Sequence, residues 1–315
     1  MTRPSIPFGR PMIDDAERDA VNDVLTGTTF VHGPASTAFE EAFAERMGVA
    51  DAISLSSCTA GLHLSLFVQG IGPGDRVAVP AMTHVATAHA VEYCGAEPVF
   101  VDVRPESGNI CPDALAAVAD GLSAVMVVHY LGLPCEMDRI SDIANAAGAF
   151  VIEDCALAVD ATWDGRKAGT LGRAGCFSFY PIKHMTSLEG GMLTTDDEAL
   201  AASIRQRKAF GYDRTLGERT RPGIYDVTAL GYNYRMNEVQ AAVGLVQLGK
   251  LDGFQAARAE NYRIIQSTLA EVDEITVFDP VQGKARSSHY CLNAVLPRDG
   301  SIDRDVVVAA LKEKE

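Results

Sequence analysis

Positive charge is scarce in this sequence. Its 315 residues include 27 Lys and Arg against 42 Asp and Glu, which gives a formal net charge of −15 and a pI of about 4.9. A surface of this sign repels the phosphates of nucleic acids and of anionic membranes, so we predict that neither is a partner. A small anionic ligand is compatible with this composition, because it needs only a local positive pocket.

The sequence also lacks a segment typical of a membrane span or of a secretory leader. Residues 52–74 carry no Asp, Glu, Lys or Arg, but the stretch contains Ser, Thr, several glycines and Pro73. It therefore indicates a strand, a turn and a buried helix rather than a span. Residues 1–7 have no apolar core of the kind that a signal peptide requires. This predicts a cytoplasmic protein.

Cysteine pairs and metal-binding patterns are missing as well. The seven cysteines are odd in number and form no Cys-x-x-Cys motif, which indicates reduced thiols in a cytoplasmic protein. The histidines show no metal-ligand spacing, and the closest two on one predicted helix are His84 and His89. We therefore predict no metal site.

What the sequence does contain is an alternation of apolar strands and helices. Continuously apolar strands separated by helices predict an α/β fold, with a mostly parallel central sheet buried on both faces. Ligands of such sheets bind at the carboxyl ends of the strands. The expected strands cover residues 52–55, 76–79, 98–102, 124–128, 150–153 and 176–180.

The pattern changes near residue 250. We predict a large cofactor-binding domain over residues 1–250 and a smaller α+β domain over residues 251–315. The elements expected in this part of the chain are helices at 237–248 and 251–269, strands near 274–278 and 288–296, and a final helix at 303–312.

The segment 177–191 is the strongest candidate for chemistry. It places Lys183 in an aromatic, hydroxyl-rich turn at the mouth of an apolar strand. A lysine taken alone is more often on the surface, but a buried one requires a partner. Desolvation lowers the pKa of a lysine readily, which suits Schiff-base chemistry. Pyridoxal phosphate would pair with Lys183 through its aldehyde and with Asp154 through its ring nitrogen.

Asp154 ends the strand expected at 150–153, and no basic residue adjoins it in the sequence. One reading is a cap for the helix or turn that follows. The other is a carboxylate held against a pyridinium nitrogen, which keeps that nitrogen protonated.

Four weaker candidates surround these two residues. The turn 56–61 joins a strand to a helix and is either a phosphate cradle or an ordinary helix cap. Ser178 is either a phosphate ligand or a structural strand serine. His84 begins a helix and either stacks on a flat ring or has no role. The aromatic and basic loop 231–238 is either a helix start or a phosphate or subunit contact.

Together these segments resemble the DegT/StrS group of nucleotide-sugar aminotransferases, which are fold-type-I pyridoxal-phosphate enzymes. The resemblance covers nearly the whole chain, and its most specific part is the lysine block, in which Lys183 lies 29 residues after Asp154. The other segments that carry it are Phe8-Gly9-Arg10-Pro11, His32-Gly33-Pro34, Ser57-Cys58-Thr59-Ala60-Gly61, Val128-His129-Tyr130-Leu131-Gly132, Asn233-Tyr234-Arg235-Met236 and Gln247-Leu248.

The resemblance implies a fold, a cofactor and a role for each candidate. The fold is that of fold-type-I transferases, and the cofactor is pyridoxal 5'-phosphate. Lys183 bonds to the cofactor and shuttles the reacting proton, and Asp154 pairs with the pyridine nitrogen. The remaining implied contacts are Thr59, the backbone of Ala60, Ser178 and Ser57 at the phosphate, His84 on the ring, and Asn233 at the phosphate of the partner subunit.

The resemblance also implies the reaction. An amino group passes from L-glutamate to a nucleotide-linked keto-sugar in a ping-pong sequence, and the enzyme works as a homodimer with shared active sites. Two departures from the family pattern stand out. Leu157 takes a place where the family often has Gln or His, and the chain stops at Glu315, which predicts an incomplete C-terminal domain.

Two other functions remain open at this point. A dehydratase of the same fold removes a sugar hydroxyl, but such relatives replace the lysine with histidine, whereas Lys183 is intact and His184 only adjoins it. A chain that lacks part of its C-terminal domain could instead be a non-catalytic subunit that binds pyridoxal phosphate.

Overall fold

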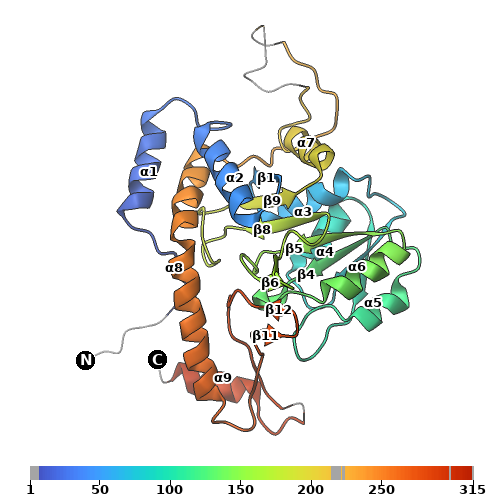
Figure 1. Ribbon diagram of the computed structural model, residues 1–315, viewed down its shortest axis with the longest axis vertical. Coiled ribbons are helices and arrows are strands. Elements are labelled where there is room, and N and C mark those ends of the chain that lie inside the picture. Colours follow the sequence, from blue (N-terminus) through green and yellow to red (C-terminus); the bar gives the residue numbers. More distant parts are fainter. Residues whose placement is uncertain (1–6, 214–220, 222–223, 298, 314–315) are drawn as a thin grey trace.

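The computed structural model describes residues 7–213, 221, 224–297 and 299–313 (Figure 1). The prediction that the chain has no signal peptide depends mainly on residues 1–6. The prediction of an incomplete C-terminal domain depends in part on residues 314–315. Both stretches lie outside the described residues. Within the described part, no helix is long and apolar enough to cross a membrane.

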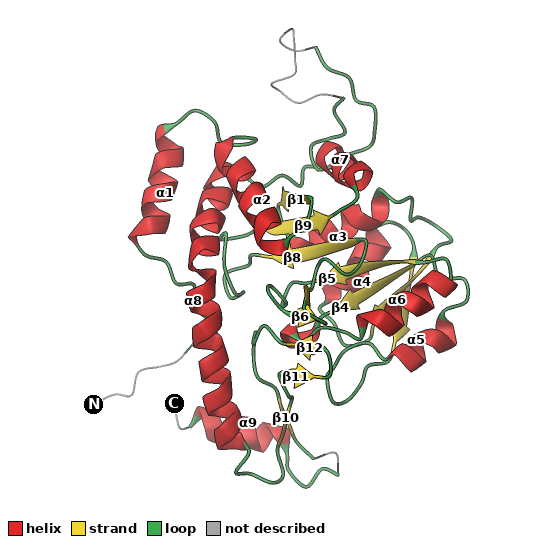
Figure 2. Cartoon of the chain, in the orientation of Figure 1, coloured by secondary structure: helices red, strands yellow, loops and turns green. Residues whose placement is uncertain are grey.

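A seven-stranded sheet forms the centre of the molecule (Figure 2). Its order is β1-β9-β8-β5-β4-β2-β3, and every pairing is parallel except the two made by β9. The predicted α/β fold with a mostly parallel sheet is therefore confirmed. The strands are β1 (Asp51–Leu55), β2 (Arg76–Pro80), β3 (Glu97–Val101), β4 (Ala124–Val128), β5 (Phe150–Asp154), β8 (Ala174–Ser178) and β9 (Gly191–Thr195).

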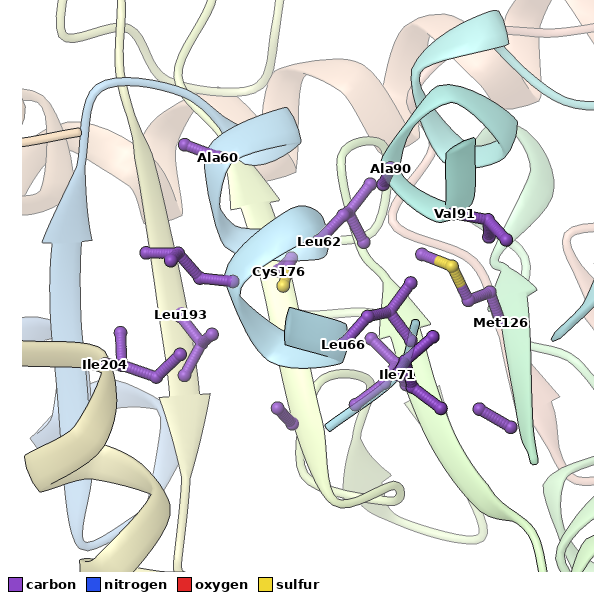
Figure 3. Packing of buried hydrophobic residues seen from close by; sticks show 14 of the residues in the cluster. Ala60, Leu62, Leu66, Ile71, Ala90, Val91, Met126, Cys176, Leu193 and Ile204 are labelled. Carbon is purple, nitrogen blue, oxygen red and sulfur yellow. The ribbon is translucent and has the colours of Figure 1, made fainter. Parts of the chain in front are cut away.

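Helices cover both faces of this sheet, and the residues of β4 show the division. Ala124 and Met126 pack into one apolar cluster, whereas Val125 and Val127 pack into another on the opposite face. Successive strand residues point to opposite faces, so a strand buried on both sides must be apolar throughout. On the first face, helix α3 (Cys58–Phe67) lies across the strands with Leu62 pointing into the core (Figure 3).

The remaining helices are distributed around this core. Helices α1 and α2 both pack against the long α8, and α7 packs against β1. Their bounds are α1 (Asp15–Thr26), α2 (Pro34–Met47), α4 (Val85–Tyr93), α5 (Pro112–Val118), α6 (Met137–Ala146), α7 (Glu198–Arg207), α8 (Glu238–Leu269) and α9 (Arg304–Lys312), with a short 3₁₀ turn at Tyr130–Gly132.

Helix α8 corrects the expectation of two helices at 237–248 and 251–269. It is a single helix of 32 residues that extends from beside α1 and α2 to α9 (Figure 1). Its start is fixed by a capping box between Asn237 and Gln240. Gly249 does not interrupt it, because Leu248 and Leu251 on either side are both buried and continue the apolar face. The predicted domain boundary at residue 250 falls inside this helix and stays a prediction.

The C-terminal segment returns to the large part of the molecule. β11 (Val281–Gln282) pairs with β12 (Ala285–Arg286), and β12 pairs with β6 (Thr162–Trp163). β6 pairs in turn with β7 (Arg166–Lys167), which completes a four-stranded sheet. β10 (Thr276–Val277) pairs with β13 (Ala294–Val295). This return brings residues 287–291 beside the lysine turn.

Candidate active site

Several of the predicted site residues follow strand ends at one edge of the sheet. β9 is antiparallel to both β1 and β8, so β1 and β8 run in the same direction, and β5 is parallel to β8. The carboxyl ends of these three strands therefore meet at the same edge. They carry Ser57, Asp154 and Ser178 there.

Asp154 is buried, with 4% of its surface exposed. The Thr87 hydroxyl donates to its Oδ2 at 2.8 Å, and the Ala156 amide donates to its Oδ1 at 3.0 Å. The Cys58 thiol lies 3.9 Å from Oδ1. No ion pair joins Asp154 to a described residue. These donors fix the orientation of the carboxylate.

The sequence did not single out Thr87, although a signal was present. Thr87 lies one turn after His84 in the predicted helix, and its hydroxyl also contacts Thr83 at 2.7 Å. A hydroxyl on the buried face of that helix could reach the strand ends. The sequence does not indicate that the Thr87 hydroxyl contacts Asp154, because the two residues are 67 positions apart.

Lys183 lies in the turn that follows β8, where its amide donates to the Tyr180 carbonyl at 2.9 Å. Burial lowers the pKa of its amine, because a desolvated ammonium is costly. The negative charge of Asp154 acts in the opposite direction and raises this pKa. The structure thus brings the two strongest candidates close enough for their charges to interact.

The start of α3 carries the predicted phosphate turn. The Ser57 side chain caps the helix by accepting from the Ala60 amide at 3.1 Å, so this cap already uses the Ala60 amide. The amides of Cys58 and Thr59 belong to the first helical turn, which has no acceptor within the helix. A Cβ at Gly191 would lie 2.4 Å from the carbonyl carbon of Ser57, so only glycine lets β9 approach this turn.

The other three predicted contacts take up different positions. Ser178 is nearly buried at the end of β8, and its Oγ accepts from the Tyr180 amide at 3.4 Å. His84 is exposed at the start of α4, where its Nδ1 accepts from the Ala86 amide at 3.2 Å. Asn233 is exposed between α7 and α8 and accepts from Arg235. The roles expected for these side chains stay predictions.

The C-terminal segment supplies a neighbour of the lysine that no sequence pattern indicated. The Lys183 Nζ lies over the ring of Tyr290, 5.1 Å from its centroid. Arg258 of α8 donates to the Tyr290 carbonyl at 2.9 Å and to the Lys183 carbonyl at 3.5 Å. His184 is fully buried, and its Nε2 donates to the Ser288 carbonyl at 3.0 Å.

A buried cluster below the sheet edge offers three possible metal ligands. The donor atoms of His129, Glu153 and Cys155 lie within 4.8 Å of one another. Both carboxylate oxygens of Glu153 already accept hydrogen bonds, from His129 and from three backbone amides of residues 169–172. This pattern holds the 169–172 loop against β5. The expectation of no metal site stays a prediction.

The residues at this edge fit pyridoxal phosphate. Lys183 offers an amine of lowered pKa for the aldehyde, and Asp154 offers a buried carboxylate for the ring nitrogen. The start of α3 offers amides and a helix dipole for the phosphate. The aldehyde, the ring nitrogen and the phosphate of this cofactor therefore each have a chemically matched group in the chain.

A protein family and individual known proteins match this chain. The model of the DegT/DnrJ/EryC1/StrS aminotransferase family matches residues 11–315. The GDP-perosamine synthase of Caulobacter vibrioides is 38% identical over 98% of this chain and 82% of its own length. The spore coat polysaccharide biosynthesis protein SpsC of Bacillus subtilis is 37% identical over 98% of this chain and 80% of its own length.

Solved structures agree with these relatives. An aminotransferase from Psychrobacter cryohalolentis superposes with a TM-score of 0.92 at 32% identity, and the match covers 98% of this chain and 82% of that one. A putative sugar aminotransferase from Streptococcus pneumoniae, solved in its PLP form, gives a TM-score of 0.89 at 25% identity over 98% of this chain and 82% of its own. With the matched family model, these similarities show that the chain belongs to the DegT/DnrJ/EryC1/StrS aminotransferase family and is a sugar aminotransferase.

Proposed function

We propose that this protein uses pyridoxal 5'-phosphate to transfer an amino group from L-glutamate to a nucleotide-linked keto-sugar. The observation that carries the proposal is that Lys183, an amine of lowered pKa, lies near enough to the buried carboxylate of Asp154 for their charges to interact at one sheet edge. An amine and a carboxylate in this relation suit a cofactor that carries an aldehyde and a basic ring nitrogen.

The cofactor, when bound, supplies an electron sink for the carbon that gains or loses the amino group. The chain's own residues do the rest. The Lys183 Nζ holds the aldehyde and moves the proton at the reacting carbon, which its lowered pKa favours near neutral pH. Asp154 keeps the ring nitrogen protonated. Thr87 and the Ala156 amide hold the Asp154 carboxylate in a fixed orientation.

The names of the relatives support a sugar substrate, and one of them supports a nucleotide-linked sugar. The name of GDP-perosamine synthase includes a nucleoside diphosphate, and the name of SpsC includes polysaccharide biosynthesis. A structural neighbour, the PseC aminotransferase of Helicobacter pylori, acts in the biosynthesis of pseudoaminic acid. We infer a sugar nucleotide with a ketone for this chain, and glutamate as the donor.

The position of His184 argues against the dehydratase reading. In that reading a histidine would replace the reacting lysine, but the His184 ring is fully buried and directed to the Ser288 carbonyl. Burial lowers the pKa of His184 to about 3, so its ring is neutral at ordinary pH. A neutral ring of this kind is a poor proton donor and cannot replace Lys183 in that role.

The test follows the two half-reactions separately. Purified protein loaded with pyridoxal phosphate should absorb visible light, and L-glutamate should bleach that absorbance. A panel of keto-sugar nucleotides, read by mass change, should then give an amino sugar and restore the colour. A deoxy-sugar product would contradict the aminotransferase in favour of the dehydratase, and a protein that takes up no cofactor would favour the non-catalytic subunit.

Lys183→Ala is the decisive variant. We expect it to lose turnover while it retains the fold, because alanine carries no amine that could bond to the aldehyde or move the proton. The matched control is Lys312→Ala, which changes an exposed lysine of α9 and should leave turnover unchanged. Turnover of Lys183→Ala at a near-normal rate would show that the role assigned to Lys183 is wrong.

A further inference from the structure

Tyr290 is the side chain of the C-terminal segment that meets the lysine amine. Its ring centroid lies 5.1 Å from the Lys183 Nζ, a separation at which a cation is attracted to the face of an aromatic ring. The two residues are more than one hundred positions apart in the sequence. The contact therefore exists only because residues 287–291 are held against the lysine turn.

Contacts from Arg258 and His184 hold that segment in place. Arg258 donates to the carbonyls of Tyr290 and Lys183, so one guanidinium fastens both backbones to α8. The Arg258 guanidinium also lies 6.0 Å from the centre of the Tyr290 ring. On the other side of the lysine turn, His184 donates to the Ser288 carbonyl. The ring thus has a fixed backbone and a cation beside it.

Arg258 is half-buried and differs in its contacts from two other cations, the buried Lys208 and the half-buried Arg46. Lys208 pairs with Glu40, and Arg46 pairs with Asp160. Arg258 forms no ion pair with any residue that the structure describes, and its hydrogen bonds there go to backbone carbonyls. Arg258 therefore joins the backbone of the lysine turn to the backbone of the C-terminal segment and, among the described residues, does not form a surface ion pair.

We propose that Tyr290 is a positioning residue for Lys183, and that Arg258 holds it there so that its ring shields the amine and orients it. The proposal rests on the proposed function only in taking Lys183 as the reacting amine. The groups that face this amine are Asp154 from β5, Cys58 from α3, Cys291 and Tyr290 from the C-terminal segment, and Arg258 from α8 across the ring.

The ring has two opposing effects on the amine, and substitutions separate them. Shielding from water disfavours the ammonium, whereas the face of the ring attracts it. Tyr290→Ala removes both effects, and because burial is the largest influence on Lys183, the amine should become more basic. Tyr290→Leu keeps an apolar cover but removes the attraction, so the amine should become less basic. Tyr290→Phe keeps both.

The experiment measures the pKa of Lys183 in the cofactor-free full chain. Competitive labelling of amines with acetic anhydride across a range of pH, read peptide by peptide by mass spectrometry, reports this residue alone. We expect the pKa to rise by about half a unit or more in Tyr290→Ala, to fall by a similar amount in Tyr290→Leu, and to stay unchanged in Tyr290→Phe. Phe100→Ala, which removes an exposed ring from β3, is the control.

A second arm tests the clamp. Arg258→Gln should shift the pKa of Lys183 in the direction of Tyr290→Ala, and Arg258→Lys should shift it less. Thermal melting identifies any variant that fails to fold, and Tyr290→Leu and Arg258→Lys are the variants that best preserve packing. An unchanged pKa in both Tyr290→Ala and Tyr290→Leu, or a shift in Tyr290→Phe as large as in Tyr290→Ala, would overturn the proposal.

The measured pKa of Lys183 tests the role of Tyr290 separately from the proposed function. If the wild-type chain captures no pyridoxal phosphate but the labelling shows the expected order of variants, the proposed function fails and the role of Tyr290 stands. If the wild-type chain transaminates and the Tyr290 variants leave the pKa of Lys183 unchanged, the proposed function stands and the role of Tyr290 fails.

Discussion

Thr87 contacts the carboxylate that we propose as the partner of the cofactor's ring nitrogen. Its Oγ1 donates to Asp154 Oδ2 at 2.8 Å in a buried setting. A hydrogen bond to a charged group contributes about 1.5–3 kcal/mol. Thr87→Val keeps the shape and removes this donor, so we expect the dissociation constant of pyridoxal phosphate to rise about tenfold or more.

Titration of visible absorbance with pyridoxal phosphate measures this effect. Thr87→Ser is the matched control, because it restores a hydroxyl at the same position and should bind nearly as tightly as wild type. Equal affinity of Thr87→Val and Thr87→Ser would contradict a role for the hydrogen bond.

His184 makes stability depend on pH. Burial lowers its pKa from 6.5 in the unfolded chain to about 3 in the folded protein. Between these values the unfolded state binds a proton that the folded state does not bind, so the free energy of unfolding falls as pH falls from about 6.5 towards 3. Below about 3 both states are protonated and this contribution is fully lost.

His184→Gln should reduce that loss, because its amide keeps a donor for the Ser288 carbonyl and does not titrate. We expect the urea midpoint of His184→Gln to fall less than that of wild type between pH 7 and pH 4.5. His89→Gln changes an exposed histidine of α4 and serves as the control. Parallel pH profiles for wild type and His184→Gln would contradict the assignment.

At the scale of elements, the long helix α8 contains glycines in two different settings. A Cβ added at Gly249 or Gly253 would meet no atom within 4 Å, whereas one at Gly244 would lie 2.6 Å from Phe39. Glycine inside a helix costs about 0.5–1 kcal/mol relative to alanine. Gly249→Ala and Gly253→Ala should therefore each stabilise the protein by about this amount.

Gly244→Ala is the matched contrast within the same helix. Phe39 is fully buried and packed against Phe43 and Phe179, so it cannot move away freely. Overpacking a core costs about 1–3 kcal/mol, and we expect destabilisation of that size by chemical unfolding. If all three substitutions changed stability in the same direction, the packing described for α8 would be wrong.

Local pattern predicted most strands of the central sheet, because each is a continuous apolar run. β4 and β5 are buried on both faces and match the expected positions to within a residue or so. Helix α2 was not predicted, although Phe39, Phe43 and Met47 recur at helical spacing and are all buried. Strand β9 was not predicted either, because its Gly191–Thr195 segment has little apolar signal despite complete burial.

Some residues of the candidate site could likewise be predicted from the sequence and others could not. Asp154 and Lys183 stand out in the sequence because each polar group follows an apolar strand. Thr87, Arg258 and Tyr290 do not stand out, since each acts through a residue that is distant in the chain. The sequence around Arg258 in α8, or around Tyr290 in the C-terminal segment, does not indicate that these side chains will lie near Lys183.

At the scale of the whole molecule, part of the surface beside the site is apolar. A hollow next to the lysine block is lined by Phe30, Val31, Leu188, Asn237 and Val239, among others. Phe30, Val31 and Leu188 are exposed there. Contiguous exposed apolar side chains are typical of surfaces that another protein covers. This is consistent with the predicted homodimer in which Asn233 completes the partner's site.

Mixing two inactive variants tests that arrangement directly. Lys183→Ala removes the reacting amine, and Asn233→Ala removes the contact predicted to cross the interface. In a hybrid dimer, the subunit with an intact Lys183 faces a subunit with an intact Asn233, so one of its two sites is complete. Random exchange makes about half of the dimers hybrid, and the mixture should recover about a quarter of the wild-type activity. Sedimentation of the mixture measures dimer formation separately, so a dimer that recovers no activity would show that Asn233 serves its own subunit.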